Sequence, residues 1–96
     1  MGPIARRMQE KLEAAFAPAL LEVEDQSARH AGHAGATRPD GTAGETHFAI
    51  RIEADAFAGL SRVARQRAVY QTLAEELAGP VHALALQARA PGEGGL

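Results

Sequence analysis

Four histidines are the side chains of this 96-residue chain with the clearest potential for metal chemistry. His30 and His33 lie three residues apart in a glycine-rich segment, whereas His47 and His82 each begin a predicted strand. Neutral imidazole is the commonest metal ligand in proteins. The sequence contains no cysteine, so a metal would have to be bound by histidines and carboxylates, without any thiolate.

The spacing of these histidines leaves two interpretations open. It matches neither a helical pair of histidines nor a Cys/His zinc pattern. The loop histidines can therefore be plain surface residues, and His82 can be a hydrogen-bonded residue at a strand end. If a metal is bound, two or three imidazoles without thiolate or carboxylate ligands form an incomplete site, and a partner protein would have to supply the remaining ligands.

Three arginines, Arg62, Arg65 and Arg67, lie at the start of a predicted helix that ends near Glu75 and Glu76. This distribution opposes the helix dipole at both ends, which costs about a few tenths of a kcal/mol per charge. The arrangement indicates a positive edge that could bind an anion, a nucleic acid or an acidic partner. The alternative is a solvated face whose long side chains cover apolar surface. We expect the two glutamates to be solvated surface residues.

The sequence offers no group of residues typical of an active site, so we do not expect an enzyme or a small-molecule substrate. Neither serine lies in a nucleophile motif, and Ser61 is better explained as the N-cap of a helix. Glu22 and Glu24 share the outward face of a predicted strand, where we expect solvated surface residues and not an acid/base pair. The formal net charge of −2 also differs from the strongly basic balance of a dedicated nucleic-acid binder, although a local basic patch is compatible with it.

The hydrophobic pattern predicts the order helix, strand, long loop, strand, helix, strand. Apolar residues recur on one face of the first helix, which begins near Pro3 and is stopped by Pro18: Ile4, Met8, Leu12, Ala15 and Phe16. The second helix follows Ser61 and ends at Gly79-Pro80, with Val63, Tyr70, Leu73, Ala74 and Leu77 on its apolar face. The strands are predicted over residues 21–24, 47–53 and 81–88.

These elements predict a two-layer α+β domain with a three-stranded mixed sheet and both helices packed on one face. The first two strands pair antiparallel, and the third lies parallel because it returns through a right-handed helical crossover. We expect a single domain over residues 1–96, with residues 1–5 and 91–96 frayed and residues 29–44 forming a long, flexible loop. No apolar run approaches the ~20 residues of a membrane span, so we expect a cytoplasmic protein.

Several motifs in order resemble the BolA family and extend from about residue 6 to residue 93. They are Leu21-Glu22-Val23-Glu24-Asp25-Gln26-Ser27, Glu45-Thr46-His47-Phe48, Phe57-Ala58-Gly59-Leu60-Ser61, Arg65-Gln66-Arg67-Ala68-Val69-Tyr70, Leu73-Ala74-Glu75-Glu76-Leu77 and Val81-His82-Ala83-Leu84. The resemblance implies a fold similar to class II KH domains, without their GxxG nucleic-acid loop.

The resemblance also implies a partner and a cofactor. Proteins of this family bind monothiol glutaredoxins through a shared 2Fe–2S cluster, in cluster assembly, trafficking or iron sensing. The glutaredoxin cysteine and glutathione are ligands on one side, and the BolA-like protein supplies the others. The family's histidine at the start of the last strand corresponds to His82. Its variable loop ligand falls in the segment of His30 and His33, of which we favour His33.

A second reading of the resemblance is a DNA-binding transcriptional regulator. Arg62, Arg65 and Arg67 would then be the residues that contact phosphates, and binding would depend steeply on salt. The family often has histidine between the last two of these arginines, where this chain has Gln66. A role that needs that imidazole is therefore not expected here. A third reading is an interaction module that binds no cluster.

Overall fold

A computed structural model of the chain describes residues 2–27 and 46–93, and the order of its elements agrees with the predicted one. The elements are α1 (Pro3–Phe16), β1 (Leu20–Asp25), β2 (His47–Glu53), the 3-10 helix η2 (Asp55–Phe57), α2 (Arg62–Thr72), α3 (Ala74–Ala78) and β3 (Ala83–Arg89). The predicted loop over residues 29–44, with His30 and His33, lies outside the described residues.

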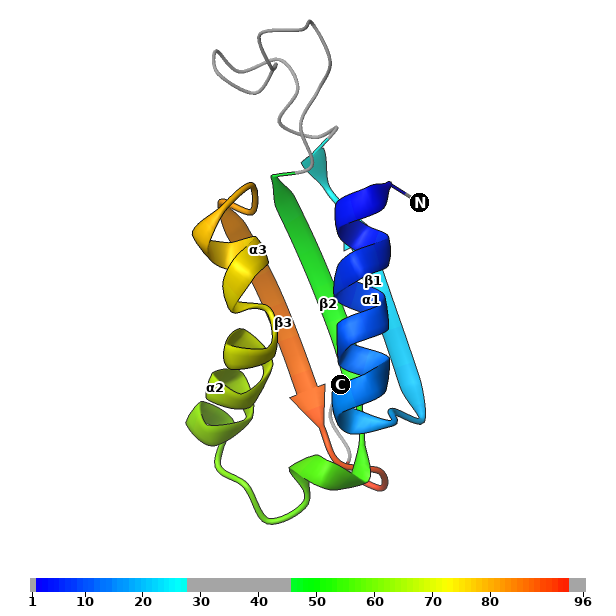
Figure 1. Cartoon of the computed structure of the whole chain (residues 1–96). Helices are drawn as coiled ribbons and strands as arrows, with labels where there is room; N and C mark the ends of the chain where they lie inside the picture. The colour runs from blue at the N-terminus through cyan, green and yellow to red at the C-terminus, as the bar shows by residue number, and fades with distance from the viewer. Residues whose placement is uncertain (1, 28–45, 94–96) are drawn as a thin grey trace, which may run out of the picture.

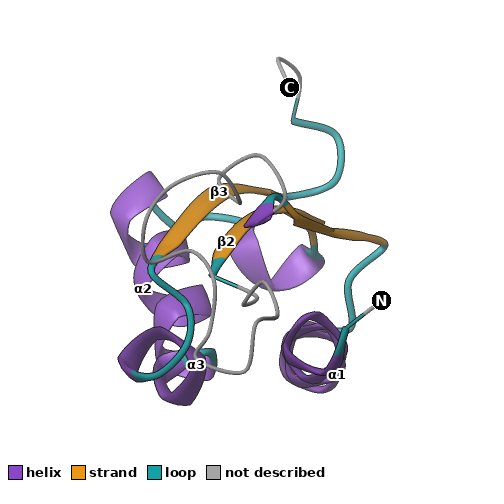
Figure 2. Ribbon diagram, turned by 90° about the horizontal axis from the view of Figure 1, so that it is seen from above, coloured by secondary structure: helices purple, strands orange, loops and turns teal. Residues whose placement is uncertain are grey.

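The sheet has the strand order β1-β2-β3 and is mixed, as predicted. β1 pairs antiparallel with β2, with Val23 opposite Ile50, and β2 pairs parallel with β3, with Ile50 opposite Leu86. α1, α2 and α3 all lie on one face of the sheet (Figures 1 and 2). The two-layer α+β architecture inferred from the hydrophobic pattern is therefore confirmed.

The core lies between the central strand and the helices. Strand alternation directs Phe48, Ile50 and Ile52 of β2 towards the helices, and all three are buried. Met8 and Leu12 of α1 are buried in the same cluster. Each such side chain stabilises the fold by about 1.5–3 kcal/mol through burial, so these positions hold the two layers together.

The predicted second helix is two helices rather than one. α2 ends at Thr72, and Leu73, with φ −103° and ψ 20°, separates it from α3. Val69 and Leu73 face the core, whereas Val63 is 56% exposed. At about 100° per residue, Val63 lies about 120° around the helix from Val69. The expectation that Val63 faces the core is therefore wrong. Ala15 and Ala74, also expected on apolar faces, are exposed.

The described residues near each end of the chain belong to regular structure. The helix begins at Pro3, and Ala5 is already buried in the core, so fraying of residues 1–5 does not describe Pro3 to Ala5. Near the other end, Glu93 N–H donates to Ala90 O over 3.2 Å and closes a turn. None of the described helices is long and apolar enough to cross a membrane.

β3 is an edge strand of the sheet, and α2 runs beside it (Figure 1). Two side chains of α2 donate hydrogen bonds to backbone carbonyls of this strand. The Tyr70 hydroxyl donates to Leu84 O over a long 3.4 Å, and Arg65 Nη1 donates to Ala88 O over 3.3 Å. The helix therefore covers part of the strand edge with polar groups.

The two valines of α2 allow a matched test of this packing. We expect Val69→Ala to lower the free energy of unfolding by about 1.5–3 kcal/mol, because it removes two buried methyl groups and leaves a cavity. Val63→Ala should change it by less than about 0.5 kcal/mol, since the side chain is exposed. Urea denaturation followed by circular dichroism measures both; equal losses would contradict the assigned helix orientation.

Candidate functional site

His82 lies immediately before β3, and its backbone is held by Thr46, the residue before β2. The His82 N–H donates to Thr46 O over 2.8 Å, and Ala83 N–H donates to the same oxygen over 3.2 Å. We expected His82 to begin the strand, but the strand starts one residue later. The residue is exposed, so its imidazole ring can reach a group outside the molecule.

His47 lies beside His82 at the same end of the sheet. The two ring centroids are 6.4 Å apart, and the ring planes are inclined by 22°. Thr46 Oγ1 is 2.8 Å from His47 Nδ1, within hydrogen-bond distance. We noted His47 from the sequence without including it among the candidate ligands. Both histidines stand at the starts of parallel strands, and this was the signal that could have paired them.

Ser27 and Thr46 are the described residues on either side of residues 28–45, and a hydrogen bond connects them. The buried Ser27 hydroxyl accepts hydrogen bonds from Thr46 N–H over 2.8 Å and His47 N–H over 3.3 Å. Asp25 Oδ1 in turn accepts from Ser27 N–H over 2.8 Å. Ser27 and Thr46, which flank the predicted loop ligands in sequence, therefore lie together, and Thr46 also holds the backbone of His82. Over residues 2–27 and 46–93, no group of three or more metal-ligand side chains is placed to hold a metal ion.

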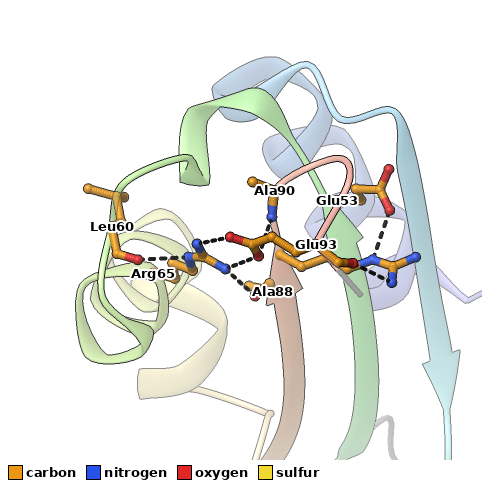
Figure 3. Close-up of polar contacts among 7 residues, drawn as sticks. Glu53, Leu60, Arg65, Ala88, Ala90 and Glu93 are labelled. Atoms are coloured by element: carbon orange, nitrogen blue, oxygen red, sulfur yellow. Dashed lines mark hydrogen bonds and ion pairs between the residues drawn. The ribbon is translucent and has the colours of Figure 1, made fainter. Parts of the chain in front are cut away.

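The three arginines predicted to contact phosphates have different surroundings. Arg62 and Arg67 are exposed on α2. Arg65 has a side chain only 13% exposed, and its guanidinium makes two bonds of 2.6 Å to the carboxylate of Glu93. Its Nε also donates to Leu60 O over 3.1 Å (Figure 3). Arg65 would have to leave these partners to contact a phosphate.

The Glu93 carboxylate accepts hydrogen bonds from both Nη atoms of the Arg65 guanidinium. The hydrogen bonds from Arg65, and then from Ala90 N–H over 2.9 Å, lower the pKa of Glu93 from 4.5 to about 2. Close by, Arg89 Nη1 donates to Glu93 O over 3.4 Å, and its Nε donates to Glu53 Oε2 over 2.8 Å. The turn after β3 is therefore held to α2 through Glu93, and the end of β3 is held to β2 through Arg89. Both contacts are charge-assisted hydrogen bonds, which are stronger than neutral ones.

Glu76 contradicts the expectation that Glu75 and Glu76 are both solvated. Glu76 is fully buried, and it is the buried charged residue of the described part of the chain. Its carboxylate accepts hydrogen bonds from Arg7 Nε over 2.7 Å and from Lys11 Nζ over 2.8 and 3.1 Å. Burial alone would raise the pKa of Glu76, but the bonds from Lys11 and Arg7 outweigh it and lower the pKa. Glu75 is exposed, as expected, and also contacts Lys11.

A family model described as BolA-like protein matches residues 12–93. BolA-like protein 1 of Pongo abelii is 43% identical over 95 residues, which are 99% of this chain and 64% of that protein. The DNA-binding transcriptional regulator BolA of Escherichia coli (strain K12) is 47% identical over 83 residues, 86% of this chain and 71% of that protein.

A solved structure of BolA1 from Arabidopsis thaliana aligns with a TM-score of 0.84 and 40% identity over 99% of each chain. The chain spans less than two thirds of the length of several curated relatives that it matches, including the Pongo abelii protein. The similarity in sequence therefore extends over nearly all of this chain, but over only part of those longer proteins.

The ion pair of Arg65 with Glu93 should make the turn after β3 sensitive to acid. Because the pKa of Glu93 is lowered, the pair stabilises the folded chain above about pH 4.5, and this stabilisation is lost as the pH falls towards about 2. An NMR titration of the Glu93 carboxyl should show a midpoint near 2. Arg65→Met should raise it towards 4.5, and Arg67→Met should leave it unchanged; a wild-type midpoint near 4.5 would refute the pairing.

Proposed function

This chain belongs to the BolA-like family, and from that premise we propose that it is a non-enzymatic adaptor for iron–sulfur clusters. In this proposal it binds a monothiol glutaredoxin that carries a 2Fe–2S cluster and shares the cluster with it, in cluster assembly, trafficking or iron sensing. The cytoplasmic location predicted from the sequence is part of the proposal. The observation that carries it is the exposed His82, whose backbone is fixed at one end of the sheet.

The surroundings of His82 suit a ligand for a metal that arrives from outside. Thr46 O holds the backbone of His82, so the residue keeps its place on the sheet while its ring stays accessible. Thr46 N–H donates a hydrogen bond to the Ser27 hydroxyl, and these two residues flank the segment that carries His30 and His33. One of these two histidines, of which we favour His33, would be the second ligand from this chain.

The chemistry of the donors explains why a partner is needed. One exposed imidazole and a second from the connecting segment form only half of the ligand set of a 2Fe–2S cluster. The glutaredoxin cysteine and glutathione would supply thiolates for the other half. A cluster with histidine ligands on one iron has a higher reduction potential than one with four cysteines. The histidines of this chain would therefore affect both where the cluster is bound and how easily it is reduced.

The proposal is tested with a monothiol glutaredoxin loaded with a 2Fe–2S cluster. Adding the wild-type chain should change the visible absorption and circular dichroism of the cluster. His82→Ala should abolish this change, because it removes a ligand, and far-UV circular dichroism should show that the fold is intact, since the side chain is exposed. His33→Ala should weaken the change more than His30→Ala. Spectra that do not depend on His82 would refute the shared cluster.

A second candidate function is DNA binding. The Escherichia coli relative that is 47% identical to this chain is named as a DNA-binding transcriptional regulator. Arg62 and Arg67 are exposed on α2, where a phosphate could reach them. Arg65 is the least suited of the three, because Glu93 already occupies its guanidinium.

If the chain binds DNA in this way, it should retain a specific duplex at about 0.15 M salt. Arg62→Ala/Arg67→Ala should abolish retention and reduce the slope of log affinity against log salt by about 0.9 per lost contact. Arg51→Ala is the matched control, because Arg51 lies on the sheet and pairs with Glu22 at 2.7 Å. Weak binding to any sequence, lost at modest salt, would exclude a specific regulator.

A further inference from the structure

The carboxylate of Glu76 forms an unusual link between α1 and α3. A charge that is removed from water is costly unless it is paired and hydrogen-bonded. Here Oε1 accepts from Lys11, and Oε2 accepts from both Lys11 and Arg7. Both cations come from α1, whereas the carboxylate comes from α3. An apolar side chain could fill the same space without needing two cations, so packing alone does not explain a charged residue here.

The backbone of Glu76 is connected to the candidate ligand. Its carbonyl oxygen accepts hydrogen bonds from Gly79 N–H over 3.2 Å and Val81 N–H over 3.0 Å. Val81 is buried in the core, and the next residue is His82. The turn between α3 and β3 is therefore anchored to Glu76 at one end and, through the N–H of His82, to Thr46 at the other.

The turn follows directly on the last residues of α3. A Cβ atom added to Gly79 would lie 3.3 Å from Glu75 O, which is tighter than most contacts of this kind. The backbone of the turn thus passes close to the end of α3. A shift of α3 relative to α1 would be transmitted through Val81 to the residue that follows it.

We infer that Glu76 is a positioning residue for His82. By binding Arg7 and Lys11, its carboxylate fixes α3 against α1, and its carbonyl then fixes the turn that leads to His82. The inference rests on the proposed role of His82 as a cluster ligand and adds the residues that set the position of that ligand. Groups that orient a metal ligand are expected to affect affinity by about 10- to 100-fold.

The test compares Glu76→Gln with Glu75→Gln in the full chain. The two glutamates are adjacent and both contact Lys11, but the side chain of Glu75 is 85% exposed. In the free protein, Glu76→Gln should shift the NMR signals of the His82 amide and imidazole, whereas Glu75→Gln should not. With the cluster-loaded monothiol glutaredoxin, Glu76→Gln should weaken binding about 10- to 100-fold and change the visible circular dichroism.

Every measurement is made well below the unfolding midpoint of each variant, so that loss of folded protein cannot cause the effect. If Glu76→Gln does not fold, Lys11→Met replaces it, because it removes two of the three hydrogen bonds that α1 donates to the carboxylate while Arg7 still pairs with the buried charge. Lys11→Arg keeps the cation and should restore the wild-type signals. Unchanged His82 signals in the variant that folds would overturn the inference. If the His82→Ala chain changes the cluster spectra as the wild-type chain does, the proposed function fails instead, and the signals of the free protein still decide the role of Glu76.

Discussion

The parallel pairing of β2 with β3 is the constraint on which the candidate site depends. It places His47 opposite Ala83, so the starts of the two strands meet at one end of the sheet. One carbonyl, Thr46 O, accepts hydrogen bonds from both His82 and Ala83. The pairing is itself maintained by the buried residues of β2, which pack against the helices. Packing in the core thus determines where a surface imidazole lies.

Much of the fold could be predicted from the sequence, because the signals involved are local. Alternating apolar residues identified β2, and the predicted cap at Ser61 is confirmed by a hydrogen bond of 3.1 Å from Ala64 N–H to its hydroxyl. The mixed sheet followed from the order of the elements. The break at Leu73 was not predicted, although Thr72 before it is a poor helix former. The Thr72 hydroxyl donates to Ala68 O over 3.0 Å, a bond that often bends helices.

The candidate site could be predicted only in part. His82 was noted because it lies after a helix-ending Gly-Pro pair, and its role as a ligand was implied by the resemblance to the BolA family; the structure places it immediately before β3 and in solvent. The burial of Glu76 could not be foreseen, since its partners Arg7 and Lys11 lie more than sixty residues away in sequence. Arg65 shows the same limit, because the carboxylate that pairs with it is 28 residues further along the chain. Pairing over such separations depends on the three-dimensional fold, and no spacing rule encodes it.

The two donors that α2 directs at β3 have a consequence for self-association. The exposed edge of a strand is a template on which another chain can add a strand, and natural sheets obstruct such edges. Tyr70 and Arg65 already occupy the carbonyls of Leu84 and Ala88. A second strand approaching this edge would meet a phenol and a guanidinium where it needs vacant acceptors. The helix that helps to cover the core thus also limits growth of the sheet on this side.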